Sequence, residues 1–424
     1  MKIQFINHAS FIIENEDIKL ICDPWIKGSA FNNGWSLLSK TKMKFDEFDT
    51  ITHIWFSHEH PDHFSPPNLM EIPKEIRENM TILFQETTDN KVLQFCKKIG
   101  FKKIIGLKEN KSLKLSQNFE ILCNQYTDGD SYALFTVNKL KILNLNDCIV
   151  NTEFKAKSLK NKIGEVDILF TQFGYANKIG NEKDTLLRKQ ASNEKLNRIF
   201  YQNKYLNPKI IVPFASFVYF SHEENKYMND GINKIDVVYS YIKNELKTSC
   251  LVMYPNDVWE LNQKIDSTIA VNNYLNDYDK INLSHYEISE SIKKEELISN
   301  CNKFLETLKK GYSDKIKIIN SLKTIVYISD YNQTYILSGK SGLIKNNSNK
   351  NYDVKLSSDS LNYCFKEFWG FDTLQINARF QITNQHSGFY NFGAIASSLN
   401  RKQTFPIPSK FSWYLLKIKN IFKK

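Results

Sequence analysis

Three of the eight histidines in this chain, together with an aspartate, lie between positions 58 and 63, directly after an apolar run. The run "THIWFS" (52–57) is rich in aromatic and β-branched residues, which predicts a short strand. Ser65 followed by Pro66 and Pro67 predicts a helix start, because serine caps free N–H groups and proline is tolerated in a first turn. The histidines are therefore expected in a loop between a strand and a helix.

The spacing within "SHEHPDH" (57–63) suits metal binding. His58 and His60 point the same way if the backbone stays extended, and a turn at Pro61 can bring Asp62 and His63 around the same point. This geometry can build two adjacent sites for one or two divalent ions, and imidazole with carboxylate ligands suits Zn or Fe. A polar surface loop is the alternative, but clustered histidines and aspartates are typical of metal or catalytic sites.

The rest of the chain predicts a layered α/β fold. Segments such as "IQFINHASFIIE", "IKLICDPW", "TILFQ" and "LKILNLND" have the composition of strands, and helices are expected near 89–100 and 183–206. With 424 residues the chain can hold two domains, and its amino-acid composition becomes more polar near residue 265. We expect a catalytic domain at 1–265, a small α+β unit at 266–400 and a basic amphipathic tail at 401–424.

Charge and hydropathy limit which partners and which cellular location we expect. The net charge is +11, but residues 401–424 hold seven basic residues and no acidic ones, which leaves +4 for the first 400. We therefore expect no nucleic-acid partner. No run of about 18 uncharged apolar residues is present and acidic residues come early, so we expect a cytoplasmic protein without a signal peptide. The seven scattered cysteines are expected to be buried free thiols.

HxHxDH after a strand is the signature of the metallo-β-lactamase superfamily, and "SHEHPDH" matches it at every ligand position. The upstream "NHASFIIENEDIKLICDPWIKGSAFNNGW" also resembles that superfamily, which includes lactonase-like hydrolases. It is most similar to the non-Rieske body of CMP-N-acetylneuraminate hydroxylases. The resemblance continues in "IIVPFASFVYFSHEENKYMND" and covers residues 1 to about 260. It implies an αββα sandwich for the first domain.

The resemblance also implies a set of site residues. Those that match the family's metal ligands are His58, His60, Asp62, His63, Asp147 and His222. Asp23 is similar to the aspartate that supports the metal loop from outside the ligand set. Asp62 is a candidate for handling a proton. His8 is similar to a histidine near the metals in lactonase-like members, and an ordinary strand histidine bonded to the backbone is equally open.

Two departures from the family bear on the chemistry. Where the superfamily usually supplies a further histidine ligand, this chain reads "ILCNQYTDGDSYA". Asp128 or Asp130 could serve there as a hard oxygen ligand, which favours iron or manganese over zinc, and a solvated turn is the alternative. No cysteine lies within two positions of a histidine, so we expect no Rieske cluster in this chain, and an oxygenase role would need a separate reductase.

Aromatic and amide residues near position 30 predict a substrate pocket. Trp25, Asn33 and Trp35 could form its wall for a sugar or another polar ring, with a structural aromatic cluster as the alternative. Four basic residues are candidates for contact with an anionic group, or else for a solvated face: Lys27, Arg188, Lys189 and Lys195.

The C-terminal part carries weaker signals. The segment "YDVKLSSDSLNYCFKEFWGFDTLQINARFQI" faintly resembles the small sterol-carrier-protein-like domains of some metallo-β-lactamase-fold enzymes. Residues 410–424, "KFSWYLLKIKNIFKK", have the composition of an interfacial helix and predict peripheral contact with the inner face of a membrane. The alternative is a basic helix docked on the protein's own surface or on a second copy.

Three functions are compatible with these features. The first is a hydrolase that uses metal-activated water on an anionic small molecule, such as a phosphorylated or nucleotide-linked sugar or a related acidic metabolite. The second is a di-iron, O2-dependent hydroxylase fed by a separate reductase. The third is a non-catalytic, membrane-associated scaffold that binds a structural metal.

Overall fold

The first strands carry apolar side chains on both faces, and this pattern builds two layers of the fold. In the computed structural model, which describes residues 1–281, 285–347, 351–384 and 388–406, β2 (Ser10–Asn15) points Phe11 and Ile13 into one core and Ile12 into another. Successive side chains of a strand point to opposite faces, so this sheet is covered by apolar groups on both sides.

Two seven-stranded sheets face each other within the described residues. The first has the order β17-β1-β2-β3-β6-β7-β8. Its other strands are β1 (Lys2–Asn7), β3 (Ile18–Cys22), β6 (His53–Phe56), β7 (Thr81–Gln85), β8 (Lys103–Leu107) and β17 (Val258–Glu260). The second has the order β16-β14-β13-β12-β11-β10-β9. Its strands are β9 (Ser112–Ser116), β10 (Phe119–Gln125), β11 (Ser131–Val137), β12 (Leu140–Asn144), β13 (Ile168–Gln172), β14 (Ile210–Phe214) and β16 (Ser249–Cys250).

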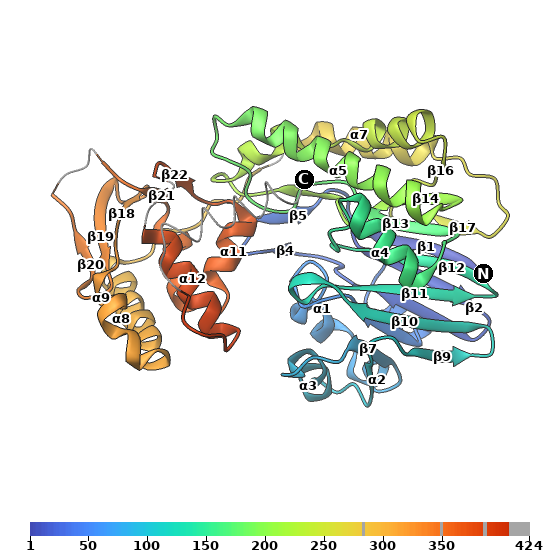
Figure 1. The fold of residues 1–424 in the computed structure, drawn as a ribbon, viewed down its shortest axis with the longest axis horizontal. Helices are drawn as coiled ribbons and strands as arrows, with labels where there is room; N and C mark the ends of the chain where they lie inside the picture. Colours follow the sequence, from blue (N-terminus) through green and yellow to red (C-terminus); the bar gives the residue numbers. More distant parts are fainter. Residues whose placement is uncertain (282–284, 348–350, 385–387, 407–424) are drawn as a thin grey trace.

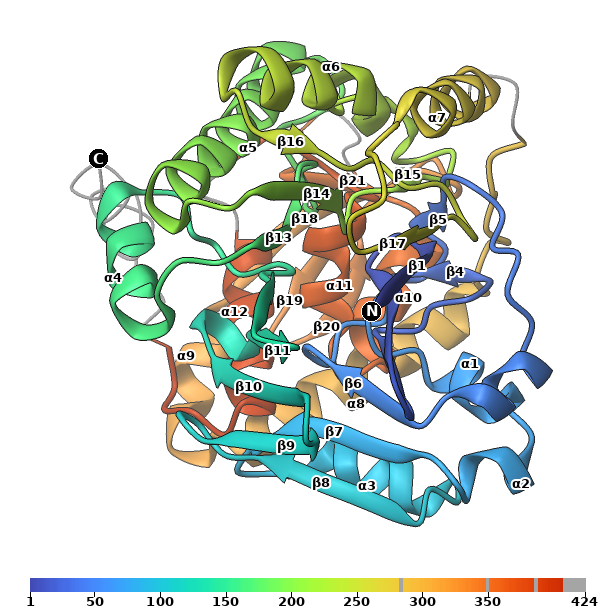
Figure 2. The same cartoon turned by 90° about the vertical axis from the view of Figure 1, so that its right-hand side faces the viewer.

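Helices cover the outer faces of both sheets (Figures 1 and 2). The first sheet is covered by α1 (Pro66–Glu71), α2 (Lys74–Arg77) and α3 (Lys91–Lys98). The second is covered by α4 (Glu153–Ile163), α5 (Thr185–Leu206) and α6 (Ile235–Ser240), with α7 (Thr268–Ile281) beside α6. The expected αββα sandwich is confirmed.

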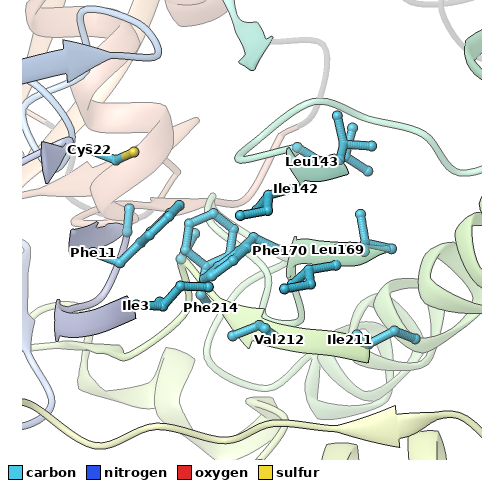
Figure 3. Packing of buried hydrophobic residues seen from close by; sticks show 14 of the residues in the cluster. Ile3, Phe11, Cys22, Ile142, Leu143, Leu169, Phe170, Ile211, Val212 and Phe214 are labelled. Atoms are coloured by element: carbon cyan, nitrogen blue, oxygen red, sulfur yellow. The ribbon is translucent and has the colours of Figure 1, made fainter. Parts of the chain in front are cut away.

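Aromatic rings fill the space between the two sheets (Figure 3). The ring of Phe11 stacks on that of Phe170 with centroids 4.0 Å apart, and Phe214 meets both rings edge-on at 5.9 and 5.3 Å. These three rings come from both sheets, so they join β2 to β13 and β14 directly.

The C-terminal unit has a sheet and a core of its own. The sheet has the order β20-β19-β18-β21-β22, and its strands are β18 (Lys323–Ile328), β19 (Gln333–Ser338), β20 (Gly342–Lys345), β21 (Val354–Leu356) and β22 (Gln381–Ile382). Its helices are α8 (Lys294–Gly311), α9 (Ile316–Ser321), α10 (Ser358–Lys366), α11 (Gly370–Asn377) and α12 (Gly388–Asn400). Figure 1 shows this unit beside the sandwich. The α+β class is as expected, and the sterol-carrier-like comparison stays a prediction.

The first domain extends beyond the expected boundary at residue 265. The polar segment after it forms α7, whose Tyr274, Tyr278 and Ile281 are buried in the core of the first domain. Tyr274 stacks on Phe217 with centroids 4.1 Å apart. Apolar side chains at helical spacing lie among asparagines and aspartates here, which explains why the polar composition alone placed the boundary before this helix.

No helix among the described residues combines the length and apolar content that a bilayer crossing requires. The predicted membrane-contacting segment 410–424 lies outside the described residues.

The aromatic contact between the sheets can be tested by Phe11→Ala. Removing a fully buried ring that touches both Phe170 and Phe214 leaves a cavity, so we expect the free energy of unfolding to fall by about 3–5 kcal/mol. Urea denaturation followed by circular dichroism measures this change. Phe154→Ala is a matched control, since that ring is 80% exposed on α4. Equal stability of the two variants would contradict the placement of the Phe11 ring between the two sheets.

Candidate metal centre

The loop after β6 folds back on itself and brings its histidines together. The backbone N–H groups of His63 and Phe64 donate to the His60 carbonyl at 3.0 and 2.7 Å, which closes the turn expected at Pro61. The ring of His58 then lies 4.2 Å from that of His63 and 4.5 Å from that of His60, measured between centroids. Ser65 precedes α1, which starts with Pro66 as expected.

Histidine and aspartate side chains form two subsites that meet at one carboxylate. The first subsite is His58, His60 and Asp130, and the second is His8, Asp62 and His63. Asp147 lies between them, and its Oδ2 is 3.9 Å from His58 Nε2 and 3.8 Å from His63 Nε2. Within each group the possible ligand atoms lie within 4.8 Å of one another, which is close enough to share an ion.

Asp23 holds the loop from behind, as expected. It follows β3, is fully buried, and accepts hydrogen bonds from the backbone N–H and the hydroxyl of Ser57, both at 2.7 Å. It also accepts a bond from Asn146 Nδ2 at 2.7 Å, and His63 Nδ1 lies 3.0 Å from its Oδ2. This last contact turns Nε2 of His63 toward the second subsite.

His8 reaches the site because its strand is interrupted. The sequence predicted one continuous strand here, whereas His8 has φ +42° in a tight turn between β1 and β2. Its Nε2 lies 3.3 Å from Asp62 Oδ2, and its carbonyl accepts a bond from the Ala215 N–H. The reading of His8 as an ordinary strand histidine does not match this geometry.

Unusual backbone conformations gather around the centre. Besides His8, three non-glycine residues at neighbouring strand ends have positive φ: Asp23 (+39°), Asn146 (+47°) and Ala215 (+51°). Such conformations are costly and are retained where a site needs a particular placement of side chains.

Several buried polar atoms of the second subsite have no hydrogen-bond partner within the described part of the chain. They are His8 Nδ1, Asp62 Oδ1 and His63 Nε2. Buried polar atoms are normally paired, and an imidazole nitrogen beside a carboxylate oxygen is a donor set for Zn, Fe or Mn. The residues present therefore fit one or two divalent ions.

Burial and neighbouring charges perturb the titration of these groups. Burial, with the charge of His63, holds the pKa of His58 well below its usual value. Burial would also lower the pKa of His63, but Asp62 and Asp147 outweigh it and hold that pKa well above its usual value. Burial would raise the pKa of Asp62, but the neighbouring imidazoles of His63 and His8 hold it well below its usual range. A positive charge is thus favoured at the second subsite.

The structure places His222 away from the loop, which corrects its expected role as a ligand. Its Nε2 lies 3.1 Å from Ser289 Oγ, and its Nδ1 accepts a bond from the Glu224 N–H. Burial and Arg379 lower its pKa to about 4. His222 follows β15 (Val218–Phe220), and this extra strand carries it beyond the end of β14 toward the C-terminal unit. His8 instead completes the second subsite.

Asp130 is the aspartate of "TDGD" that joins the centre. Its Oδ1 lies 3.9 Å from His58 Nε2, and it directly precedes β11. Asp128 belongs to the short helix Thr127–Gly129, and its side chain lies outside the described part of the structure.

A buried chain of polar groups supports Asp147. Gln172, at the end of β13, donates from Nε2 to Asp147 Oδ1 at 3.0 Å, and Lys195 Nζ donates to Gln172 Oε1 at 3.0 Å. Burial, with Arg198, lowers the pKa of Lys195 to about 7. Gln172 was not predicted as a site residue, because its only signal in the sequence is its place at the end of a buried strand.

A small cavity adjoins Asp62. Trp35 lines it with Gln172, Tyr175, Ser216, Phe220 and Asn233, among others. Trp35 belongs to β5 (Trp35–Leu37), which with β4 (Ser29–Ala30) and β15 forms a small sheet over the site. Of the predicted pocket residues, Trp35 alone is part of this lining.

The other predicted pocket and anion-contact residues have different surroundings. Trp25 is buried with its ring edge-on to His8, and exposed Asn33 accepts a bond from the Ser29 hydroxyl. Each of the following has a polar partner of its own: Lys27 pairs with Glu71, Arg188 with Asp230, and Lys195 with Gln172. Lys189 is exposed on α5.

The sequence model of the beta-lactamase superfamily domain matches residues 2–215, which is half of the chain. The chain therefore belongs to the beta-lactamase superfamily, in the branch that the HxHxDH loop and the αββα sandwich define.

Among curated proteins, the chain is 24% identical over 299 residues to the cytidine monophosphate-N-acetylneuraminic acid hydroxylase of Danio rerio, covering 64% of this chain and 47% of that protein. It thus spans about half the length of the curated relatives it matches. A possible metal-dependent hydrolase from Veillonella parvula is 13% identical, with 62% of this chain and 99% of that chain covered and a TM-score of 0.46. CmlA, a diiron β-hydroxylase from Streptomyces venezuelae, is 13% identical, with 61% of this chain and 54% of that chain covered and a TM-score of 0.43.

Metal binding at the second subsite should release a proton. Because Asp62 and Asp147 raise the pKa of His63, its imidazole holds a second proton more readily in the metal-free protein, and an ion must displace that proton. We expect the affinity for Zn²⁺ to fall as the pH is lowered and about one proton to be released per ion at this subsite. Calorimetric titration in buffers of different ionisation enthalpy counts the protons. His63→Gln should abolish the release of the proton. His53→Gln changes a histidine outside both subsites and should not.

The Gln172 contact should tune the affinity of the metal. Gln172→Leu removes the donor to Asp147, and loss of such a supporting bond weakens metal binding by about 10- to 100-fold. The same change leaves Lys195 buried without its acceptor, so the variant also loses stability. The double variant Gln172→Leu/Lys195→Met should recover stability but not metal affinity. Recovery of both would contradict a role for Gln172 at Asp147.

Proposed function

We propose that this protein is a metal-dependent hydrolase that acts on an anionic small molecule, such as a phosphorylated or nucleotide-linked sugar or a related acidic metabolite. The observation that carries the proposal is the pair of histidine–aspartate subsites sharing Asp147, with buried Asp62 lining a neighbouring cavity. The cavity has room for about one water molecule, which is the nucleophile that metal-activated hydrolysis requires.

Zinc, iron or manganese ions bound at such ligands lower the pKa of water and polarise an electrophile. Asp62 is the proton acceptor in our proposal. Its Oδ2 lies 3.3 Å from His8 Nε2, and its Oδ1 is buried without a partner within the described residues, so one carboxylate oxygen is left to accept the proton of a metal-bound water. No side-chain nucleophile is required.

The cavity lining and the charge of the centre support the proposed substrate class. Divalent ions at the centre would place positive charge beside the cavity, which attracts an anionic group. No lysine or arginine is found among the lining residues that the structure describes. The lining is aromatic and amide instead, around a space of about one water molecule: Trp35, Tyr175, Phe220, Gln172 and Asn233.

A di-iron hydroxylase is the second candidate. Asp130 adds a hard oxygen ligand to the first subsite, and oxygen-rich sets favour iron or manganese over zinc. The curated relatives named as cytidine monophosphate-N-acetylneuraminic acid hydroxylases support this alternative. It would need a separate reductase.

A structural metal site in a scaffold is the third candidate. Structural zinc sites are usually closed by four protein ligands, whereas here a cavity reaches Asp62, which favours catalysis. We further propose that the protein acts in the cytoplasm, with its tail at the inner face of a membrane.

Metal analysis and an oxygen test separate these functions. We expect about one or two Zn, Fe or Mn ions per chain, and hydrolysis of phosphorylated sugars or nucleotide sugars that proceeds under argon and stops when a chelator removes the metal. Full activity of metal-free protein would exclude the hydrolase proposal. Turnover that requires O2 and a reductant would establish the hydroxylase instead.

The role of Asp62 can be tested by Asp62→Asn. Loss of a proton acceptor should lower kcat by about 10²- to 10⁴-fold. Asp89→Asn, at an exposed turn before α3, is the matched control and should keep full activity. Equal activity of the two variants would exclude Asp62 as the base.

A further inference from the structure

One turn of the first domain has a backbone that its own sequence does not favour. Phe31, Asn32 and Asn33 have φ of +53°, +54° and +57°, so three consecutive residues adopt the left-handed conformation. L-residues avoid this conformation, and asparagine tolerates it as a single residue more readily than in a run. The turn at residues 31–34 therefore depends on bonds from elsewhere.

Those bonds come largely from the C-terminal unit. Asn377 Nδ2, at the end of α11, donates to the Phe31 carbonyl at 3.0 Å, and Arg379 Nη1 donates to the Asn32 carbonyl at 2.8 Å. The approach is so close that a Cβ on Gly34 would lie 2.4 Å from that of Asn377. Figure 1 shows α11 next to β4 and β5, which flank the turn.

Arg379 is rigidly held where it enters the first domain. Its side chain is fully buried, and it binds Glu224 and Asp359, each at 2.8 Å, and Ser289 Oγ at 2.9 Å. A planar guanidinium group with several hydrogen-bond partners has little conformational freedom. The Asn32 carbonyl therefore accepts its hydrogen bond from a donor whose position is fixed. The turn is thus anchored to residues about 350 positions away in sequence.

The same turn also contacts the candidate metal centre. The ring of Phe31 meets the ring of His60 edge-on with centroids 6.1 Å apart, and it meets Trp35 at 4.7 Å. His60 belongs to the first subsite, and Trp35 lines the cavity beside Asp62.

The C-terminal unit also binds the segment that follows Tyr175. Lys178 N–H donates to the Gln375 carbonyl at 2.8 Å, and Asn181 exchanges two hydrogen bonds with the backbone of Ile382, at 2.6 and 2.9 Å. These residues follow Tyr175, which lines the cavity. Residues 375–382 therefore bind two segments that adjoin cavity-lining residues, the turn before Trp35 and the segment after Tyr175.

We propose that Asn377 and Arg379 are positioning residues of the metal centre, which act through the left-handed turn at residues 31–34 to fix His60 and the wall of the cavity. The C-terminal unit is then a working part of the site and not an appended module. The inference rests on the metal-binding part of the proposed function and is independent of the reaction.

A double-mutant cycle on the full chain tests this path with Co²⁺ as the probe. Asn377→Ala removes the bond to the turn, and Phe31→Leu removes the ring on His60 while keeping the backbone carbonyl that Asn377 binds. Each variant should weaken Co²⁺ binding several-fold, measured by competition with a chromophoric chelator, and should shift the visible absorption bands of the bound ion. Because both changes act through one contact, the double variant should bind no more weakly than the worse single variant.

Asn300→Ala is the matched control. It removes an amide–amide bond to Asn362 inside the C-terminal unit, far in sequence from any residue of the turn. It should lower the melting temperature about as much as Asn377→Ala but leave Co²⁺ affinity and spectrum unchanged. Identical metal binding in both variants, or strictly additive effects in the cycle, would overturn the proposal. Failure of the unaltered protein to bind Co²⁺ would instead contradict the proposed function.

If Asn377→Ala does not fold, Phe31→Tyr provides a second measurement. It keeps the aromatic contact with His60, so it should retain the Co²⁺ spectrum that Phe31→Leu loses. Equal spectra for these two variants would overturn the proposal.

Discussion

One buried carboxylate fixes the geometry on which the metal centre depends. Asp23 is bonded to both polar groups of Ser57, to Asn146 and to His63, so a single side chain ties together the ends of β3, β6 and β12. Hydrogen bonds to an ionised acceptor are stronger than neutral ones, and removing the carboxylate would leave several buried donors unpaired at once. His63 gains its orientation directly from this group.

The αββα arrangement explains why one centre can be assembled from distant segments. Metal-loop residues follow β6, Asp147 follows β12, Asp130 precedes β11, and His8 sits at the turn between β1 and β2. All lie at one edge of the two facing sheets, whose aromatic core keeps the sheets in register with each other. Loops carried by a rigid framework can hold strained conformations, as His8 and Asp23 do.

The sequence predicted the parts of the site that rest on local spacing. The loop from His58 to His63, its supporting Asp23 and the sandwich fold follow from short motifs and periodicity. Other features depend on contacts that local pattern does not encode. His222 matched a family position but is carried away by β15, and Gln172 shows its role only once β12 and β13 lie side by side. The apolar positions of α7 stand among polar residues in the sequence, so its buried face was not predicted. The contacts of residues 375–382 join segments that are too far apart in sequence for any motif to reveal.

The anchoring of the left-handed turn by Asn377 and Arg379 also bears on how the protein is made. Every residue of the two subsites and Asp147 lies within the first 147 positions, so a ribosome delivers the complete ligand set early in synthesis. The contacts that anchor the turn form only once residues 375–382 have also emerged. A chain truncated before residue 375 would therefore carry every residue of the two subsites but would lack the bonds that hold the turn beside His60.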